Sequence, residues 1–282
     1  MQENKAELKV LIEKAILSDE KSLEILLTEV QNTVFNLSLR MLGTVTDAED
    51  ATQDILIRIM TNLSSFRMES SFSTWVYRLS INFLINYKKS MFSHYPLDFE
   101  FYGNDIRFAQ ADSADELIEE LSREQLAAEL KMSCTNVMLQ CLDTESRCIF
   151  ILGTMFKIDS HIASEILDIS PENYRQKLSR IRKKVAGFLS YHCGLTETGF
   201  CRCSKRVDYA VSQKRINPKK LEYSQLETLD KQILVTYTKE MEKLEALSDT
   251  FEKLPNYKSP IAAYSIIQTL LQSAPFNKIK SF

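Results

Sequence analysis

Positively charged side chains crowd one short stretch in the second half of the chain. Within ten residues the sequence places Arg175, Lys177, Arg180, Arg182, Lys183 and Lys184. Ser170 offers a helix N-cap before them, and Pro171 suits the first helical position. Cations on such a helix neutralise phosphates, while side chains near its start reach base edges when the helix lies in a major groove. This pattern favours a DNA-binding helix, and the alternative is a solvated basic helix face.

A second stretch, residues 66–90, combines aromatic rings, small polar residues and cations, and it holds the only tryptophan, Trp75. Single-stranded nucleic acid is bound by aromatic faces together with cations and small hydrogen-bonding groups. Helical spacing favours a different use, in which one stripe of a helix over residues 72–89 fills a core. The stripe consists of Phe72, Val76, Leu79 and Phe83. The polar residues 67–71 before the helix could then bind an unpaired base.

Carboxylates load the first two turns of a third helix, whose sequence DAEDATQDILIRI begins after Gly43. We expect Thr46 to cap it, with Glu49 completing a capping box. Acidic side chains near a helix N-terminus are stabilised by the helix dipole, so they need no functional explanation. The exposed face also suits a protein partner, since it combines Gln53, Asp54, Ile57 and Arg58. The residues alone do not choose between these interpretations.

Thiols and an imidazole gather in the sequence HCGLTETGFCRC. The candidate metal ligands are His192, Cys193, Cys201 and Cys203. Four such ligands could close a tetrahedral structural zinc site, although a C-x-x-C pair is missing. The C-x-C pair could instead act in thiol redox chemistry, or the thiols could be unremarkable. The remaining cysteines recur every seven residues and are expected to be core residues on one helix stripe: Cys134, Cys141 and Cys148.

Composition favours helices, because the 282 residues contain only 6 glycines and 6 prolines, while 44% are hydrophobic. The net charge of −3 requires any nucleic-acid binding to come from local basic patches. No apolar run is long enough for a spanning helix, and the polar N-terminus is unlike a signal peptide. We therefore expect a cytoplasmic protein with reduced cysteines. With 3 histidines and no nucleophile–base pair, P-loop or dinucleotide fingerprint, an enzyme is not expected.

The expected fold is all-α, with two small helical domains joined by an acidic linker and followed by a helical extension. The boundaries are residues 5–90 for the first domain, 91–131 for the linker, 132–191 for the second domain and 192–282 for the extension. Within the second domain, a short helix, a tight turn and the longer basic helix outline a helix-turn-helix. Within the extension we expect a long helix over residues 221–254 and a last helix over residues 260–272.

The order of these features resembles the sigma-70 family of bacterial RNA polymerase sigma factors, extracytoplasmic-function (ECF) type. DAEDATQD followed by SFSTWVYRLSIN resembles the family's second conserved region. LDTESRCIFILGTMFKIDSHIASEILDISPENYRQKLSRIRKKV resembles its fourth region. The match to the second region starts earlier, at LIEKAILSDEKSLEILLTEVQNTVFNLSLRMLG, and the resemblance as a whole covers about two-thirds of the chain. Two departures stand in the fourth region, where Asp168 replaces the usual glycine of the turn and ENYRQKL replaces GTVKSRL. The promoter sequence is therefore not inherited from a relative.

The resemblance implies a role for each matching stretch. In the family the acidic helix docks on the clamp coiled coil of the largest polymerase subunit, which implies docking here by Asp50, Gln53, Asp54 and Ile57. The loop and helix that follow capture a base flipped from the minus-10 element. Their matching residues are Phe66, Arg67, Ser70, Ser71, Trp75, Arg78, Asn82 and Lys88. The recognition helix reads the minus-35 element, and its matching residues are Asn173, Tyr174, Arg175, Lys177, Arg180, Arg182 and Lys183.

The resemblance thus implies a protein that binds core RNA polymerase and directs promoter recognition and melting, without catalysis or a required cofactor. An anti-sigma factor is a further candidate partner. The extension lies outside the family's two-domain plan and could regulate it by packing on the DNA-binding domain or the polymerase. The alternative is a one-component helix-turn-helix regulator that senses metal or redox state through its cysteines. Such a regulator has no need for the acidic helix and the aromatic loop.

Overall fold

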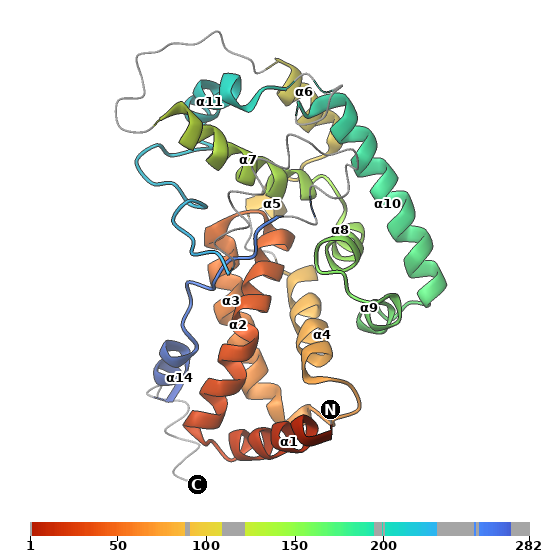
Figure 1. Ribbon diagram of the computed structural model, residues 1–282, viewed down its shortest axis with the longest axis vertical. Coiled ribbons are helices and arrows are strands. Elements are labelled where there is room, and N and C mark those ends of the chain that lie inside the picture. Colours follow the sequence, from red (N-terminus) through yellow and green to blue (C-terminus); the bar gives the residue numbers. More distant parts are fainter. Residues whose placement is uncertain are drawn as a thin grey trace.

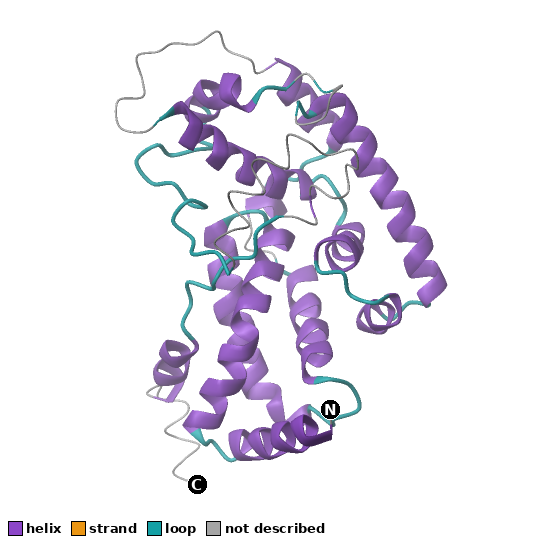
Figure 2. Ribbon diagram, in the orientation of Figure 1, coloured by secondary structure: helices purple, strands orange, loops and turns teal. Residues whose placement is uncertain are grey.

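The computed structural model describes residues 2–87, 91–108, 122–194, 199, 201–229, 251 and 254–271. Within these ranges the regular elements are helices (Figure 2), which confirms the expected all-α class. A single isolated antiparallel bridge joins Thr228 to Tyr257. In the described part of the chain, no helix has the length and apolar character needed to cross a membrane.

The N-terminal half is a bundle of helices α1 (Gln2–Ile16), α2 (Glu20–Leu42), α3 (Val45–Asn62) and α4 (Phe72–Ile85). Helix α2 packs against the other three, and α3 also packs against α4 (Figure 1). Asp19 caps α2, because its carboxylate accepts a hydrogen bond from the Ser22 N–H at 2.9 Å. Gly43 ends α2 in the left-handed region, with φ of 86°, where glycine carries no Cβ penalty.

Two short helices, α5 (Met91–His94) and α6 (Phe99–Phe108), lead to the second half, which begins with α7 (Arg123–Leu139) and α8 (Thr144–Phe150). Helix α8 continues into a π-helical turn, Ile151–Met155, followed by α9 (Ser160–Leu167) and α10 (Pro171–His192). The expected linker thus contains helices α5 and α6, and α7 runs across the expected boundary between residues 131 and 132. The most acidic part of the linker, residues 112–120, lies outside the described residues.

One continuous core joins the two halves, since buried apolar residues from α2 to α4 contact those from α7 to α10. A half-buried arginine, Arg147, fixes the joint at the end of α2. Its guanidinium donates to the Met41 carbonyl at 2.7 Å and to the Leu139 carbonyl at 3.0 Å. It also donates to the carbonyls of Gln140 and Leu142, so one side chain satisfies the ends of two helices.

The extension begins with α11 (Cys203–Ser212), which packs on α7 around a small separate core. The helix expected over residues 221–254 is wrong in its first part, because residues 221–229 are irregular. The buried carboxylate of Glu129 explains this, since it accepts backbone N–H groups from Glu222, Tyr223 and Ser224 at 2.6 to 3.0 Å. Residues 230–250 lie outside the described residues, and the last helix is α14 (Ala263–Leu271).

Candidate nucleic-acid interface

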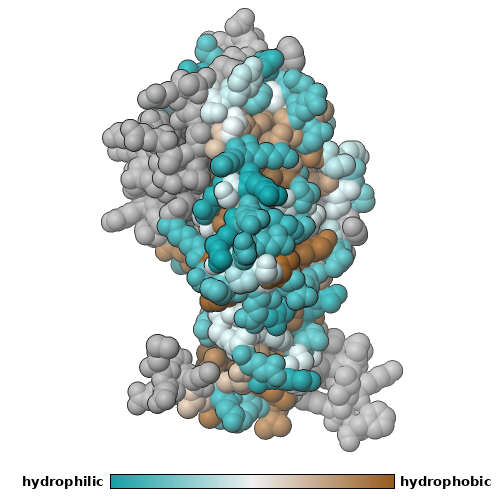
Figure 3. All heavy atoms as spheres, turned by 90° about the vertical axis from the view of Figure 1, so that its right-hand side faces the viewer, coloured by the Kyte–Doolittle hydropathy of each residue, from teal (hydrophilic) through white to brown (hydrophobic). Residues whose placement is uncertain are grey.

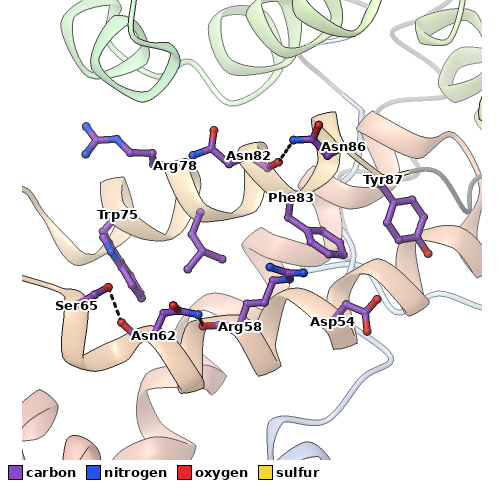
Figure 4. A pocket seen from close by; sticks show the side chains of 11 residues that line it. Asp54, Arg58, Asn62, Ser65, Trp75, Arg78, Asn82, Phe83, Asn86 and Tyr87 are labelled. Atoms are coloured by element: carbon purple, nitrogen blue, oxygen red, sulfur yellow. Dashed lines mark hydrogen bonds between the residues drawn. The ribbon is translucent and has the colours of Figure 1, made fainter.

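An open groove of about 750 Å³ runs between α3 and α4 (Figure 4). Helix α4 and the residues just beyond it line one wall with Trp75, Arg78, Leu79, Asn82, Phe83, Asn86 and Tyr87. Helix α3 and the turn after it line the other with Asp54, Arg58, Asn62 and Ser65. The groove therefore combines an indole, two guanidinium groups and three amides, which are groups that stack on bases and hydrogen-bond to their edges.

Two residues of the expected core stripe line this groove instead. Val76 and Phe72 are buried as expected, but Leu79 and Phe83 are only half-buried. The α4 core face includes Ile81 and Leu84 because α4 packs on α2 and α3 on one side and on α9 on the other. The Arg58 guanidinium lies 4.8 Å from the centre of the Phe83 ring, a cation–π contact across the groove.

The loop before α4 rests on a cluster of three aromatic rings. Phe66 is buried, with its ring centre 5.6 Å from that of Phe72 and 5.5 Å from that of Trp75. Its ring therefore supports the loop from below and does not face solvent. Arg67 is exposed, and Met68 takes a positive φ of 60°, so the backbone makes a sharp turn over this cluster.

Small hydroxyl side chains start α4. The Ser71 hydroxyl oxygen accepts the Thr74 N–H at 3.1 Å, which is an N-cap contact. It also lies 2.9 Å from the Ser73 hydroxyl and 2.7 Å from that of Thr74. Of the expected minus-10 residues, Ser71 thus has a structural role as well, while Ser70 is half-buried beside it.

Trp75, Arg78 and Asn82 follow one another along α4 and all line the groove. Trp75 points toward α3, whereas Arg78 and Asn82 project from the outer edge of α4 (Figure 4). Asn82 is exposed, and Trp75 and Arg78 are partly exposed. Arg78 is engaged by the second half of the molecule, since its guanidinium lies 2.8 Å from the Glu165 carboxylate on α9. Lys88, the last residue expected at this site, lies outside the described residues.

Helix α3 presents the acidic surface that the sequence indicated. Asp50 and Gln53 are exposed, whereas Asp54 and Ile57 are half-buried, and Asp54 lines the groove. The expected cap was wrong, because α3 starts earlier and the Thr44 hydroxyl, not that of Thr46, accepts the Asp47 N–H at 3.2 Å. Gly43 ends α2 and Thr44 caps α3, so the two caps are adjacent and no longer turn separates the two helices.

The helix-turn-helix consists of α9 and α10, and the small Ala163 of α9 is fully buried. Asp168 sits at the turn in the left-handed region with φ of 54°, the conformation that the family's glycine would take. Ser170 caps α10, since its hydroxyl accepts the Asn173 N–H at 3.2 Å. The glycine of the π-helical turn, Gly153, lies directly beneath α10.

Most basic side chains of α10 point away from the core. Arg175, Arg180 and Lys183 are exposed, as is Asn173, whereas Lys177 pairs with Glu145 of α8. Seen from the side of α9 and α10, hydrophilic residues cover the middle of the molecule (Figure 3). Arg182 donates to the Thr154 hydroxyl at 3.0 Å and to the Gly153 carbonyl at 2.9 Å, so it also fastens α10 to the turn below.

Tyr174 was expected to contact DNA, and the structure corrects this. It is only 1% exposed, and its hydroxyl donates to the Ile149 carbonyl at 3.3 Å. Burial raises the pKa of this phenol to about 12. Tyr174 belongs to the apolar stripe of α10, which also includes Ile181 and Val185, so its ring holds the helix in place.

The cysteine cluster does not assemble a ligand set. Within the described ranges, no three side chains of His, Cys, Asp or Glu are placed to hold one metal ion. The His192 ring packs on Phe188, with ring centres 4.6 Å apart. A hydrogen bond from Cys203 and the charge of Arg206 lower the pKa of Cys201 to about 7 despite its burial. A structural zinc ion at these residues stays a prediction.

The spacing of the other three cysteines suggested that they share one helix, but they do not. Cys134 lies on α7, Cys141 in the turn after it and Cys148 on α8. Cys141 and Cys148 are buried in the core, which confirms the expected packing role.

Sequence reasoning missed the α3 wall of the groove as a nucleic-acid surface. Arg58 and Asn62 follow Asp54 at intervals of four residues, so all three project from one face of α3. Asn82 and Asn86 repeat the same interval on the helix opposite. The interval was visible in the sequence, but only the packing of α3 against α4 shows that these faces meet.

A family model, "Sigma-70 region 2", matches residues 26–90, which include α3, the aromatic loop and α4. The "RNA polymerase sigma-H factor" of Pseudomonas aeruginosa is 23% identical over 175 residues, covering 62% of this chain and 90% of that protein. The "ECF RNA polymerase sigma factor SigW" of Bacillus subtilis is 28% identical over 154 residues, covering 54% and 81%.

The "ECF RNA polymerase sigma-E factor" of Escherichia coli is 35% identical over 78 residues, covering 28% of this chain and 40% of that protein. Among solved structures, "Structure of CnrH in complex with the cytosolic domain of CnrY" matches with a TM-score of 0.46 and 19% identity. It covers 64% of this chain and 95% of that one.

Proposed function

This chain belongs to the ECF type of the sigma-70 family, the sigma factors that serve RNA polymerase in transcription initiation, and we propose how its surfaces divide that work. The acidic face of α3 docks on the clamp coiled coil of the largest polymerase subunit. Asp50 and Gln53 support this assignment because they are exposed side by side on α3. The half-buried Asp54 and Ile57 follow on the same helix, and Asp54 also lines the groove.

The groove between α3 and α4 receives the unpaired strand of the minus-10 element. The observation that carries this proposal is that Trp75, Arg78 and Asn82 of α4 line one open groove together with Arg58 and Asn62 of α3. The Trp75 ring points toward α3, and Arg78 and Asn82 lie along the other edge of α4 (Figure 4). Extracting a base from the duplex costs about a few kcal/mol of stacking and pairing. Stacking on an aromatic side chain returns roughly 1 to 3 kcal/mol per base, and the guanidinium groups add phosphate contacts.

Helix α10 reads the minus-35 element from the exposed side that carries Asn173, Arg175, Arg180 and Lys183. Its first turns reach base edges and its later cations contact phosphates, because the N-terminal part of a recognition helix enters the groove. An anti-sigma factor stays a prediction. The one-component regulator is not favoured, since it leaves residues 26–90 without a role.

The experiment is core polymerase binding followed by run-off transcription from genomic fragments. Asp50→Lys should weaken polymerase binding strongly, because it reverses the charge at the centre of the docking face. Glu29→Lys is the matched control, since Glu29 is an exposed acid on α2 outside that face. If the unaltered protein does not bind core polymerase at low salt, or if both variants bind equally, the docking assignment is wrong.

A further inference from the structure

An extended piece of the C-terminal extension lies along α2 and is bound through its main chain. We call residues 254–263 the docked segment. The α2 residues that bind it form the α2 polar row, which consists of Gln31, Asn32, Asn36 and Arg40. Figure 1 shows the chain that leads to α14 running beside α2 and α3. The segment runs antiparallel to α2, because its later residues meet the earlier members of the row.

The two buried members of the row bind the start of the segment. Asn36 is 1% exposed, and its side-chain amide donates to the Tyr257 carbonyl at 2.7 Å and accepts the Tyr257 N–H at 2.8 Å. Arg40, also 1% exposed, donates to the Pro255 carbonyl at 2.6 Å. A side-chain amide that makes both bonds to one residue acts as the neighbouring strand would in a sheet.

The other two members of the row continue the pattern. The Asn32 side-chain oxygen accepts the Ser259 N–H at 2.8 Å. The Gln31 side-chain oxygen accepts the Ala263 N–H, the first of α14, at 3.0 Å. The row therefore binds N–H and carbonyl groups over nine residues of chain without depending on the side chains of the segment, Tyr257 excepted.

The opposite edge of the segment is paired as well. The Leu229 N–H donates to the Asn256 carbonyl at 3.0 Å, and the Lys258 N–H donates to the Glu227 carbonyl at 2.7 Å. The main chain of the segment is thus hydrogen-bonded on both edges. Because buried backbone groups need partners, removing either edge would favour release of the segment into water.

The segment occupies the joint between the two halves of the molecule. Phe251, just before it, is fully buried with its ring centre 5.1 Å from that of Phe150 on α8. Arg40, which holds Pro255, also donates to the side-chain oxygen of Asn136 on α7 at 2.8 Å. The extension therefore contacts the first half through α2 and the second through α7 and α8.

In the same arrangement of the two halves, α9 contacts α4. A second groove of about 760 Å³ separates them, and Arg78 and Asn82 form part of its α4 wall. Promoter elements at minus-10 and minus-35 are about 25 base pairs apart, or roughly 85 Å at about 3.4 Å per base pair. Since Arg78 and Glu165 are in direct contact, α4 and the helix-turn-helix cannot occupy both elements in this arrangement.

We propose that the docked segment is an intramolecular ligand of α2 that holds the two DNA-binding halves together, and that it must leave before both promoter elements are bound. The inference rests on the proposed promoter-binding function. It gives the extension a regulatory role, in which release of residues 254–263 from the α2 polar row opens the joint.

The first test replaces Asn36 with leucine, which has a side chain of similar size but removes both hydrogen bonds to the Tyr257 main chain. The docked population should fall, and promoter affinity of the variant assembled with core polymerase should rise about tenfold, because two backbone hydrogen bonds are lost. Thr52→Val is the matched control. Thr52 is a buried polar residue of α3 whose hydroxyl donates only to the Ala48 carbonyl among the described contacts.

The second test changes the segment and leaves α2 intact, so that misfolding of the bundle cannot explain the result. Tyr257→Ala removes a fully buried ring and should release the segment, whereas Tyr257→Phe keeps the ring. Among the described residues no group hydrogen-bonds to the Tyr257 hydroxyl, so the phenylalanine variant should behave as the unaltered protein does.

Two readouts separate the inference from the function on which it rests. Hydrogen exchange of residues 254–263 in the full chain should accelerate in Asn36→Leu and Tyr257→Ala and not in the controls. Promoter affinity of the assembled holoenzyme should rise in the same two variants. Faster exchange without a gain in affinity, or unchanged exchange, overturns the inference. Loss of polymerase binding by the unaltered protein would instead overturn the proposed function.

Discussion

The two helices proposed to contact the promoter stand in opposite surroundings. Helix α4 is enclosed, because α3 lies along one side and α9 along the other, and its Arg78 is paired with Glu165. Helix α10 is open, because it packs along one face and turns its cations outward. The duplex element can therefore be met by a surface that is already exposed, while the unpaired strand needs a surface that must first be uncovered.

The largest effect should come from filling the space under the open helix. In Gly153→Ala, the new Cβ would lie 2.5 Å from Leu178 Cδ2 and 2.6 Å from the Tyr174 hydroxyl oxygen. Such overpacking costs about 1 to 3 kcal/mol and displaces α10. Urea unfolding should show the loss. Gly187→Ala is the control, since no atom lies within 4 Å of its Cβ position. Equal stabilities would mean that α10 does not rest on this glycine.

Substitutions in the groove beside the enclosed helix α4 should reduce promoter opening more than they reduce stability. Asn82→Ala and Arg58→Ala remove exposed polar groups from the groove, so each should change stability by less than about 0.5 kcal/mol. Promoter opening should nevertheless fall about tenfold, which corresponds to about 1.4 kcal/mol. Opening can be followed with a fluorescent base in the minus-10 element. Unfolding of either variant, or unchanged opening, would remove the groove from the mechanism.

Acid should loosen the support at the far end of the open helix. Phe99 and Tyr102 of α6 pack on Phe188 of α10, and Asp105 of α6 is held by Arg206, Arg215 and Tyr209 of the extension. Burial alone would raise the pKa of Asp105, but hydrogen bonds from Arg215 and Tyr209 and the nearby charges lower it overall.

A carboxyl whose folded-state pKa is lowered contributes stability above its unfolded pKa of about 3.9. That contribution is lost as the pH falls from about 5 through the lowered folded pKa. Hydrogen exchange of α11 should rise over this range in the unaltered protein. Asp105→Asn should start less protected and lack this titration. An identical pH dependence in both proteins would rule out Asp105 as the group responsible.

The smallest effect should come from the ion pair between Arg78 of α4 and Glu165 of α9. Arg78 and Glu165 are 40% and 50% exposed in their side chains, and pairs of that kind contribute about 0 to 1 kcal/mol. Glu165→Gln should therefore leave the melting temperature nearly unchanged, while Arg78 becomes more available to DNA. Binding of single-stranded minus-10 DNA should strengthen slightly and should depend more steeply on salt. Weaker binding would show that Glu165 assists the DNA.

Periodicity predicted α10 well, because its cations lie opposite a single apolar stripe that packs on the rest of the molecule. It failed where a helix is packed on two sides, since Leu79 and Phe83 follow the core spacing and still line a groove. It also failed in the extension, where the apolar spacing of residues 221–229 suggested a helix. There the carboxylate of Glu129, more than ninety residues earlier, takes the backbone N–H groups.

The same distinction between helical spacing and long-range packing applies to the candidate site residues. Arg175 and Arg180 are exposed, as helical spacing alone predicts, and their contact with DNA stays a prediction. Tyr174 was misplaced because an aromatic residue with a hydroxyl fits both a core and a DNA surface, and only packing decides. Arg58 and Asn62 were missed because the groove exists only once α3 and α4 are brought together by contacts distant in sequence.

Recognition through the main chain has a consequence for how this extension can vary between species. The α2 polar row binds N–H and carbonyl groups that every residue except proline presents, so the exposed positions Asn256, Lys258 and Pro260 can diverge without loss of docking. Relatives with the same device should therefore be found through the spacing of Asn32, Asn36 and Arg40. The sequence of the segment itself would be a poor guide to its ancestry.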